Sequence, residues 1–292
     1  MPTTALRPGR RPGKRANIAA APDAPTSATA YKVTGLRVLR SEWAKFWSLR
    51  SSWITLGVAV FLLVLFGTIA SYTYSPDATA PGGPPGGGSG DSTAVSLALT
   101  GVTFASLAVG VLGVLLSAGE YSTGMIRSTL AAVPRRLPVL WSKAAVIGPI
   151  ALALTSIGAL AAFLLGTPGL DGEKIALSLG DDGVLRSLAG AGVYLGLVAV
   201  FGVALGVLIR SSAGAIAALV GILLILPGLA SLLPDSLYDS INPYFPGNAG
   251  QAVYALHQSS DSLSPGAGIA VFAGWVALTL AGAAYRLVKT DA

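Results

Sequence analysis

The chain has 292 residues, of which 53% are hydrophobic and 11% are charged. A soluble globular domain has roughly 25% charged residues, so this composition excludes an ordinary water-soluble fold. The sequence contains no cysteine, which excludes disulfides, thiolate catalysis and Cys-ligated metals. The composition therefore predicts an integral membrane protein.

Six stretches of the sequence carry no acidic or basic residue, and each is long enough to cross a bilayer. A helix rises about 1.5 Å per residue, so roughly 20 apolar residues span a hydrocarbon core about 30 Å thick. The predicted spans are residues 53–73, 95–118, 144–166, 187–209, 212–233 and 266–286. The fold class is therefore expected to be all-α, with a six-span transmembrane domain over residues 51–289.

The charges between the spans predict how the chain is oriented. If the N-terminus is cytoplasmic, every Lys and Arg except Lys174 and Arg186 lies on the cytoplasmic side. Such a distribution follows the positive-inside rule. We therefore expect both termini to be cytoplasmic.

The residues before the first span divide into two parts. Residues 1–30 lack periodicity and contain five arginines and lysines, so we expect a disordered basic cytoplasmic tail. Residues 31–50 are expected to form an amphipathic helix, because apolar residues recur there every three or four positions. Those residues are Leu36, Leu39, Trp43, Phe46 and Trp47. Tryptophan and basic residues favour the headgroup region, so Trp43, Phe46 and Trp47 are expected on an interfacial helix at the inner surface. The alternative is that this helix extends the first span into the cytoplasm.

The connection between the second and third spans, residues 119–143, is the longest internal segment on the predicted cytoplasmic side. We expect Ser122 or Thr123 to cap a two-turn helix here. Pro134 should end that helix, because the residue before a proline is disfavoured in helical conformation. The helix is either incidental to a basic topology loop or a docking element for a cytoplasmic partner.

The segment at residues 240–260 has no acid or base apart from His257, but it is rich in Asn, Gln and Pro. It is too polar and too interrupted to cross a bilayer alone. Irregular backbone at membrane depth requires protein or water to satisfy its polar groups. We expect an external or re-entrant element packed on the bundle, with a seventh crossing as the alternative.

These features together resemble a known family. The six spans, the amphipathic helix before them, the stretch Gly119-Glu120-Tyr121-Ser122-Thr123-Gly124 with Pro134-Arg135-Arg136, and the stretch from Pro243 to Ala252 are similar to permease subunits of bacterial type-2 ATP-binding-cassette (ABC) exporters. The resemblance covers about residues 31–289. It implies a plasma-membrane location and short external re-entrant helices before the last span.

The resemblance also implies partners. In this family the helix between the second and third spans is a coupling helix that inserts into a cleft of the ATPase subunit. Carried over by position, the coupling residues are Glu120, Tyr121, Ser122, Thr123, Gly124, Met125, Ile126, Arg127, Pro134, Arg135 and Arg136. The expected partners are two ATPase subunits, which bind ATP and Mg²⁺, a second identical or paralogous permease subunit, and membrane lipids. No nucleic acid is expected.

The residues that the sequence lacks also favour a permease that works with a separate ATPase. No Gly-x-x-x-x-Gly-Lys-Ser/Thr phosphate loop occurs, so ATP hydrolysis is expected on another polypeptide. We expect neither catalysis nor cofactor or metal binding by this chain, and we expect Glu120 to pair with a nearby base such as Arg127 or to anchor the coupling loop. Proton-coupled carriers place ionisable groups inside their spans, and the six predicted spans have none. A non-transporting scaffold or accessory subunit and an ion-coupled carrier remain alternatives.

Overall fold

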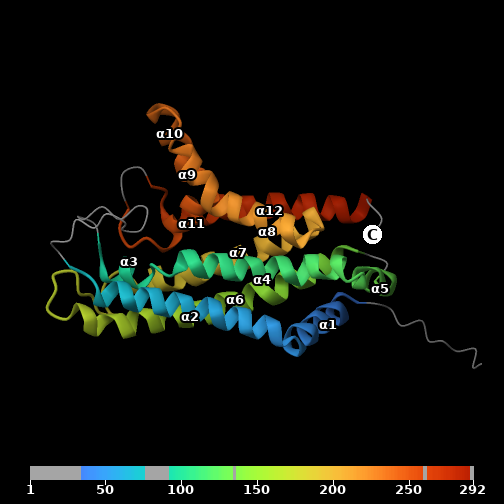
Figure 1. Ribbon diagram of the computed structural model, residues 1–292, viewed down its shortest axis with the longest axis horizontal. Helices are drawn as coiled ribbons and strands as arrows, with labels where there is room; N and C mark the ends of the chain where they lie inside the picture. Colours follow the sequence, from blue (N-terminus) through green and yellow to red (C-terminus); the bar gives the residue numbers. More distant parts are fainter. Residues whose placement is uncertain (1–33, 76–91, 134–135, 259–261, 290–292) are drawn as a thin grey trace, which may run out of the picture. The chain divides into compact units, whose positions relative to one another are not determined.

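The computed structural model describes residues 34–75, 92–133, 136–258 and 262–289, and these residues form helices and their connections (Figure 1). Six stretches are long and apolar enough to cross a membrane. They are α2 (Arg50–Tyr72), α3 and α4 (Ala94–Ala98 and Val102–Ser122), α6 (Leu137–Gly166) with η1 (Thr167–Leu170), α7 (Val184–Ile209), α8 to α9 (Ser212–Val220, Gly221–Ile225 as η2, and Leu226–Ala230), and α12 (Pro265–Lys289). The all-α class and the six candidate spans are confirmed, as in a multi-pass membrane protein. The expected basic tail at residues 1–30 lies outside the described residues.

Helix α7 is the central helix of the bundle. In its apolar stretch 72% of the residues are buried, the largest share among the six candidate spans. Helix α7 packs against α4, α6, α8, α11 and α12. Gly192 and Gly196 face α6, and a Cβ at Gly196 would lie 3.0 Å from the carbonyl oxygen of Gly148. Gly202 and Gly206 face α4 in the same way. Small residues allow this approach in a membrane, where the hydrophobic effect does not drive helices together.

The polar segment before the last span forms three short elements in place of a crossing. These are α10 (Asp235–Ile241), η3 (Asn242–Tyr244) and α11 (Pro246–Tyr254). Helix α11 packs against α7, α12 and η2. A Cβ on Gly250 would lie 2.0 Å from the Tyr194 ring, and the Arg186 guanidinium donates to the carbonyl of Ala255 at 2.8 Å. Within the described ranges there is no seventh helix of spanning length, so the alternative of a seventh crossing is wrong.

Helix α1 (Gly35–Ser48) precedes the first span and packs against α6. Leu49 has an extended backbone, with φ −87° and ψ 104°, so α1 and α2 are separate helices. This break contradicts a continuous extension of the first span. Trp43 and Trp47 lie on the exposed side of α1, but Phe46 is 2% exposed and packs edge-on against Trp53. Phe46 belongs to the inward-facing positions because it follows Val38 and Glu42 at helical spacing.

The connection between the second and third spans is shorter than expected. Helix α4 continues to Ser122, and α6 begins at Leu137, seven residues before the predicted span. Between them lies α5 (Met125–Ala132), which ends before Pro134 as expected. The predicted cap is wrong: Gly124, at φ 73°, starts α5, and no side chain caps it. The Ser122 and Thr123 hydroxyls instead donate to the carbonyl of Gly119 and so complete the end of α4.

Helix α1 and the C-terminal end of α12 lie at the same end of the bundle as α5 (Figure 1). The Arg136 guanidinium, just before α6, donates to the carbonyl of Leu287 near the end of α12 at 3.1 Å. Lys45 of α1 donates to Glu120 of α4 at 3.1 Å. We call this the α5 end, and the opposite one the α11 end.

Two glycine substitutions test the close contact between α4 and α7. A Cβ at Gly202 would lie 2.2 Å from the carbonyl oxygen of Gly110, whereas a Cβ at Gly274 in α12 would meet nothing within 4 Å. We expect Gly202→Ala to destabilise the protein by about 1–3 kcal/mol through overpacking. Gly274→Ala should stabilise it by about 0.5–1 kcal/mol, because alanine favours the helix. Thermal unfolding midpoints in detergent measure both, and equal shifts would contradict the close contact.

Candidate functional site

Four charged side chains meet where α1, α4 and α6 converge at the α5 end. They are Glu42 and Lys45 of α1, Glu120 of α4 and Lys143 of α6, and we call them the charge cluster. The Lys143 ammonium donates to Glu42 Oε2 at 2.8 Å and to Glu120 Oε1 at 2.7 Å. The Lys45 ammonium donates to Glu42 Oε1 at 2.9 Å and to Glu120 Oε1 at 3.1 Å. Each lysine therefore bridges both acids.

The charge cluster is neutral and largely withdrawn from solvent. The side chains of Glu42, Glu120 and Lys143 are each 6% exposed, and that of Lys45 is 34% exposed. Taking a charge out of water is costly unless an opposite charge and hydrogen bonds compensate it. Lys143 has a third acceptor, the carbonyl of Leu116 at 3.2 Å. The cluster therefore holds three helices in one arrangement, because moving any of them would leave a buried charge without its partner.

The same contacts shift the pKa values of the two α1 groups. Burial by itself raises the pKa of the Glu42 carboxyl, but the charges and hydrogen bonds of Lys143 and Lys45 outweigh burial and hold that pKa below its ordinary value of 4.5. Burial by itself lowers the pKa of the Lys45 amine, but the two glutamates outweigh it and raise that pKa above 10.5. Glu42 and Lys45 are therefore both charged at neutral pH.

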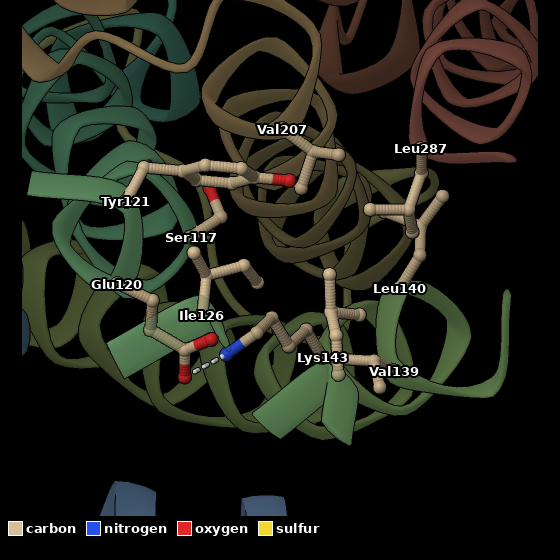
Figure 2. A pocket seen from close by; sticks show the side chains of 10 residues that line it. Ser117, Glu120, Tyr121, Ile126, Val139, Leu140, Lys143, Val207 and Leu287 are labelled. Atoms are coloured by element: carbon tan, nitrogen blue, oxygen red, sulfur yellow. Dashed lines mark hydrogen bonds and ion pairs between the residues drawn. The ribbon is translucent and has the colours of Figure 1, made fainter. Parts of the chain in front are cut away.

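Helix α5 is anchored beside the charge cluster. Ile126 is 6% exposed and points into the junction of α4, α6, α7 and α12, as Figure 2 shows. The space enclosed there measures about 10 Å³, close to the minimum for a single water molecule. This volume is far too small for a substrate. Its lining residues are Ser117, Glu120, Tyr121, Ile126, Leu130, Val139, Leu140, Lys143, Val207 and Leu287.

Arginines connect the ends of α7 and α12 to the same region. The Arg286 guanidinium donates to the carbonyl of Leu208, and the Arg210 guanidinium donates to the carbonyl of Arg286 at 3.3 Å. Arg210 also lies over the Tyr121 ring, 5.3 Å from its centroid. The last carbonyls of a helix have no intrahelical partner, and a cation there is favourable. Arginine contacts thus secure both helix ends beside α4.

The predicted coupling residues have different environments in the structure. Glu120 is buried in the charge cluster, and Arg136 is bonded to the end of α12. Met125 is 46% exposed on α5, whereas Ile126 is buried. Tyr121 lies at the end of α4, with its ring under the Arg210 guanidinium.

Three of the predicted coupling residues lie wholly or partly outside the described residues. Pro134 and Arg135 lie outside the described residues, as does the side chain of Arg127, the partner expected for Glu120. The structure pairs Glu120 with Lys143 and Lys45 instead.

The sequence interpretation missed the role of three members of the charge cluster. They are Glu42, Lys45 and Lys143; the sequence predicts an ion pair only for Glu120. One signal was present in the sequence: Glu42 is the single acid of its helix and lies four residues from both Val38 and Phe46, on a stripe that is otherwise apolar. A charge on an apolar stripe needs a buried partner.

Comparison with known proteins does not supply a family. No protein-family model matches the sequence, and no curated protein matches it. In the described part of the chain, no group of three or more His, Cys, Asp or Glu residues is placed to hold a metal ion. At this end the structure therefore has a helix junction held by buried ion pairs, with the partly exposed helix α5 beside it.

Lys143→Met tests whether the charge cluster holds the helices together. Methionine keeps the length of the side chain but leaves two buried glutamates that share only the partly exposed Lys45. Removing one partner of a buried ion pair typically destabilises a protein by about 3–5 kcal/mol. Lys45→Met, the matched control, should have a smaller effect because Lys45 is more exposed. Thermal unfolding midpoints in detergent compare the two, and equal losses would contradict the central role of Lys143.

The charge cluster should also make stability depend on acid pH. A carboxyl whose pKa is lowered by folding stabilises the protein fully above its unfolded pKa, and that contribution disappears as pH falls through the folded pKa. We expect the stability difference between wild type and Glu42→Gln to be constant above about pH 5 and to shrink below about pH 4.5. Unfolding midpoints measured from pH 7 to pH 3 test this. Asp182→Asn, at an exposed acid, is the control. A difference that stays constant into acid would contradict the prediction.

Proposed function

We propose that the chain is the membrane permease subunit of a bacterial ABC exporter of the type-2 family, and that α5 is its docking element for a separate ATPase subunit. The observation that carries the proposal is the placement of α5. It is a distinct eight-residue helix between the second and third candidate spans, with one side anchored and the other exposed. Ile126 faces the bundle, whereas Met125 and Ser128 are exposed.

A docking helix transmits movement only if the chain on either side of it is attached to the spans. Residues before and after α5 make such attachments. Glu120 precedes α5 and is bonded to Lys143 and Lys45, while Arg136 follows it and is bonded to the carbonyl of Leu287. Displacement of α5 by a partner would therefore be passed to α1, α4, α6 and α12 together.

The remaining parts of the proposal come from the sequence. Without a phosphate loop, ATP and Mg²⁺ belong on the partner, and the chain itself is not an enzyme. A second permease subunit, identical or paralogous, would complete the pathway. Acids and bases are missing from the middle of all six spans, which disfavours a carrier driven through intramembrane carboxylates. The positive-inside rule places the α5 end and both termini in the cytoplasm.

Met125→Glu tests whether α5 binds an ATPase. We expect the tagged wild-type chain, extracted in mild detergent, to co-purify with a polypeptide that contains a phosphate loop, identified by mass spectrometry. The substitution places a charge on the exposed side of α5, where the apolar Met125 is proposed to contact the ATPase. Loss of that contact should reduce recovery of the ATPase at least about tenfold.

The matched control is Leu232→Glu, which makes a similar change at a residue that is 81% exposed near the α11 end. This variant should recover the ATPase as wild type does. Equal recovery with Met125→Glu would remove α5 from the interface. Recovery of no ATPase with any variant, under conditions in which a known exporter complex survives, would favour the scaffold alternative.

A further inference from the structure

An apolar groove lies between α1 and the first turns of α6. It measures about 280 Å³, near the lower limit of typical ligand pockets. Five of its six lining residues are apolar, and the sixth is an arginine. The lining residues are Leu36, Leu39, Arg40, Trp43, Ala145 and Val146.

The groove has a positive charge at its edge. Arg40 is exposed and makes no hydrogen bond or ion pair with any other described residue. The one acid of α1, Glu42, faces inward and is compensated by Lys143 and Lys45. Nothing on α1 therefore neutralises Arg40, and an apolar groove with a cation at its edge complements a molecule that has an anionic head and a hydrocarbon tail.

The position of the groove along α6 matches the boundary of a bilayer. Lys143 is the last charged residue before the charge-free stretch that begins at residue 144. Ala145 and Val146 line the groove at the start of that stretch. Trp43, 47% exposed on the facing helix, is a residue type enriched at headgroup depth. The arginine thus lies at the polar edge and the apolar walls lead toward the hydrocarbon.

We propose that this groove binds one anionic phospholipid of the surrounding bilayer, with the phosphate held by Arg40 and part of an acyl chain lying between α1 and α6. Guanidinium groups bind phosphate through paired, charge-assisted hydrogen bonds. A zwitterionic lipid would fill the same apolar walls with the same phosphate, but its own cation offsets the phosphate charge, so its headgroup should attract Arg40 less. The inference requires only that the six helices cross a membrane, and it is independent of an ATPase partner.

Native mass spectrometry of the full-length chain in detergent tests the proposal, with phosphatidylglycerol and phosphatidylcholine of identical acyl chains as probes. We expect wild type to retain phosphatidylglycerol about fivefold more than phosphatidylcholine, as expected for one basic residue near the membrane surface. Arg40→Ala should abolish this preference. Arg50→Ala removes the same charge from a nearby exposed position outside the groove and should leave the preference unchanged.

A second variant tests the groove itself. Ala145→Phe fills the space from an exposed position and keeps Arg40, so it should lower retention of both lipids. An undiminished preference in Arg40→Ala, or an equal loss in Arg50→Ala, would overturn the proposal in favour of general surface charge. Displacement of the lipid by excess inorganic phosphate alone would show that the arginine binds phosphate without using the groove, which also overturns it.

Occupancy of the groove by a second copy of the chain would give a different result. A lipid-free dimer that dissociates in Ala145→Phe would overturn the proposal as well. If Ala145→Phe does not fold, the comparison of Arg40→Ala with Arg50→Ala still decides the outcome.

Discussion

Close backbone contact along α7 is the constraint on which the rest of the packing depends. In lipid, the hydrophobic effect does not press one apolar helix against another, so van der Waals contact and interhelical hydrogen bonds must do so. Glycines on two sides of α7 let it approach α6 through Gly192 and Gly196, and α4 through Gly202 and Gly206. The hydroxyl of Ser117 adds a hydrogen bond from α4 to the carbonyl of Val203 at 3.0 Å. The positions of α4 and α6 around α7 then determine where the charged residues at their ends can meet.

The two ends of the bundle are held by different interactions. At the α11 end, short helices pack on α7. Gly250 lies against the Tyr194 ring, and the Arg186 guanidinium donates to the carbonyl of Ala255. At the α5 end, buried charges and arginine contacts to helix carbonyls join five helices. Neutral packing tolerates small displacements, whereas a buried ion pair requires short distances to compensate its lost hydration. The buried charges at the α5 end therefore favour movement of these helices as a unit, which is what the proposed docking role requires.

Helix α1 links the two proposals. Its inner side carries Glu42 into the charge cluster, beside the proposed ATPase-docking helix. Its other side carries Arg40 and Trp43 into the groove where an anionic lipid is proposed to bind. A lipid that holds α1 against α6 would also stabilise the bond between Glu42 and Lys143. Lipid composition could thus influence the same junction that the ATPase is proposed to move.

The sequence by itself determined the six spans, a helix before them and the short helix ending before Pro134. These follow from the length of the charge-free stretches, from helical periodicity and from the backbone restriction imposed by proline, all of which are local properties. Only the extended backbone at Leu49 in the structure showed that the helix before the spans is separate from the first span. Only the tertiary structure decided that Phe46 is buried and that Glu120 pairs with Lys143 and Lys45. Glu42 and Lys143 are 101 residues apart in the chain, so no local pattern relates them. They meet because the packing of α1 on α6 brings them together, and a buried charge must then take the partner that this packing provides.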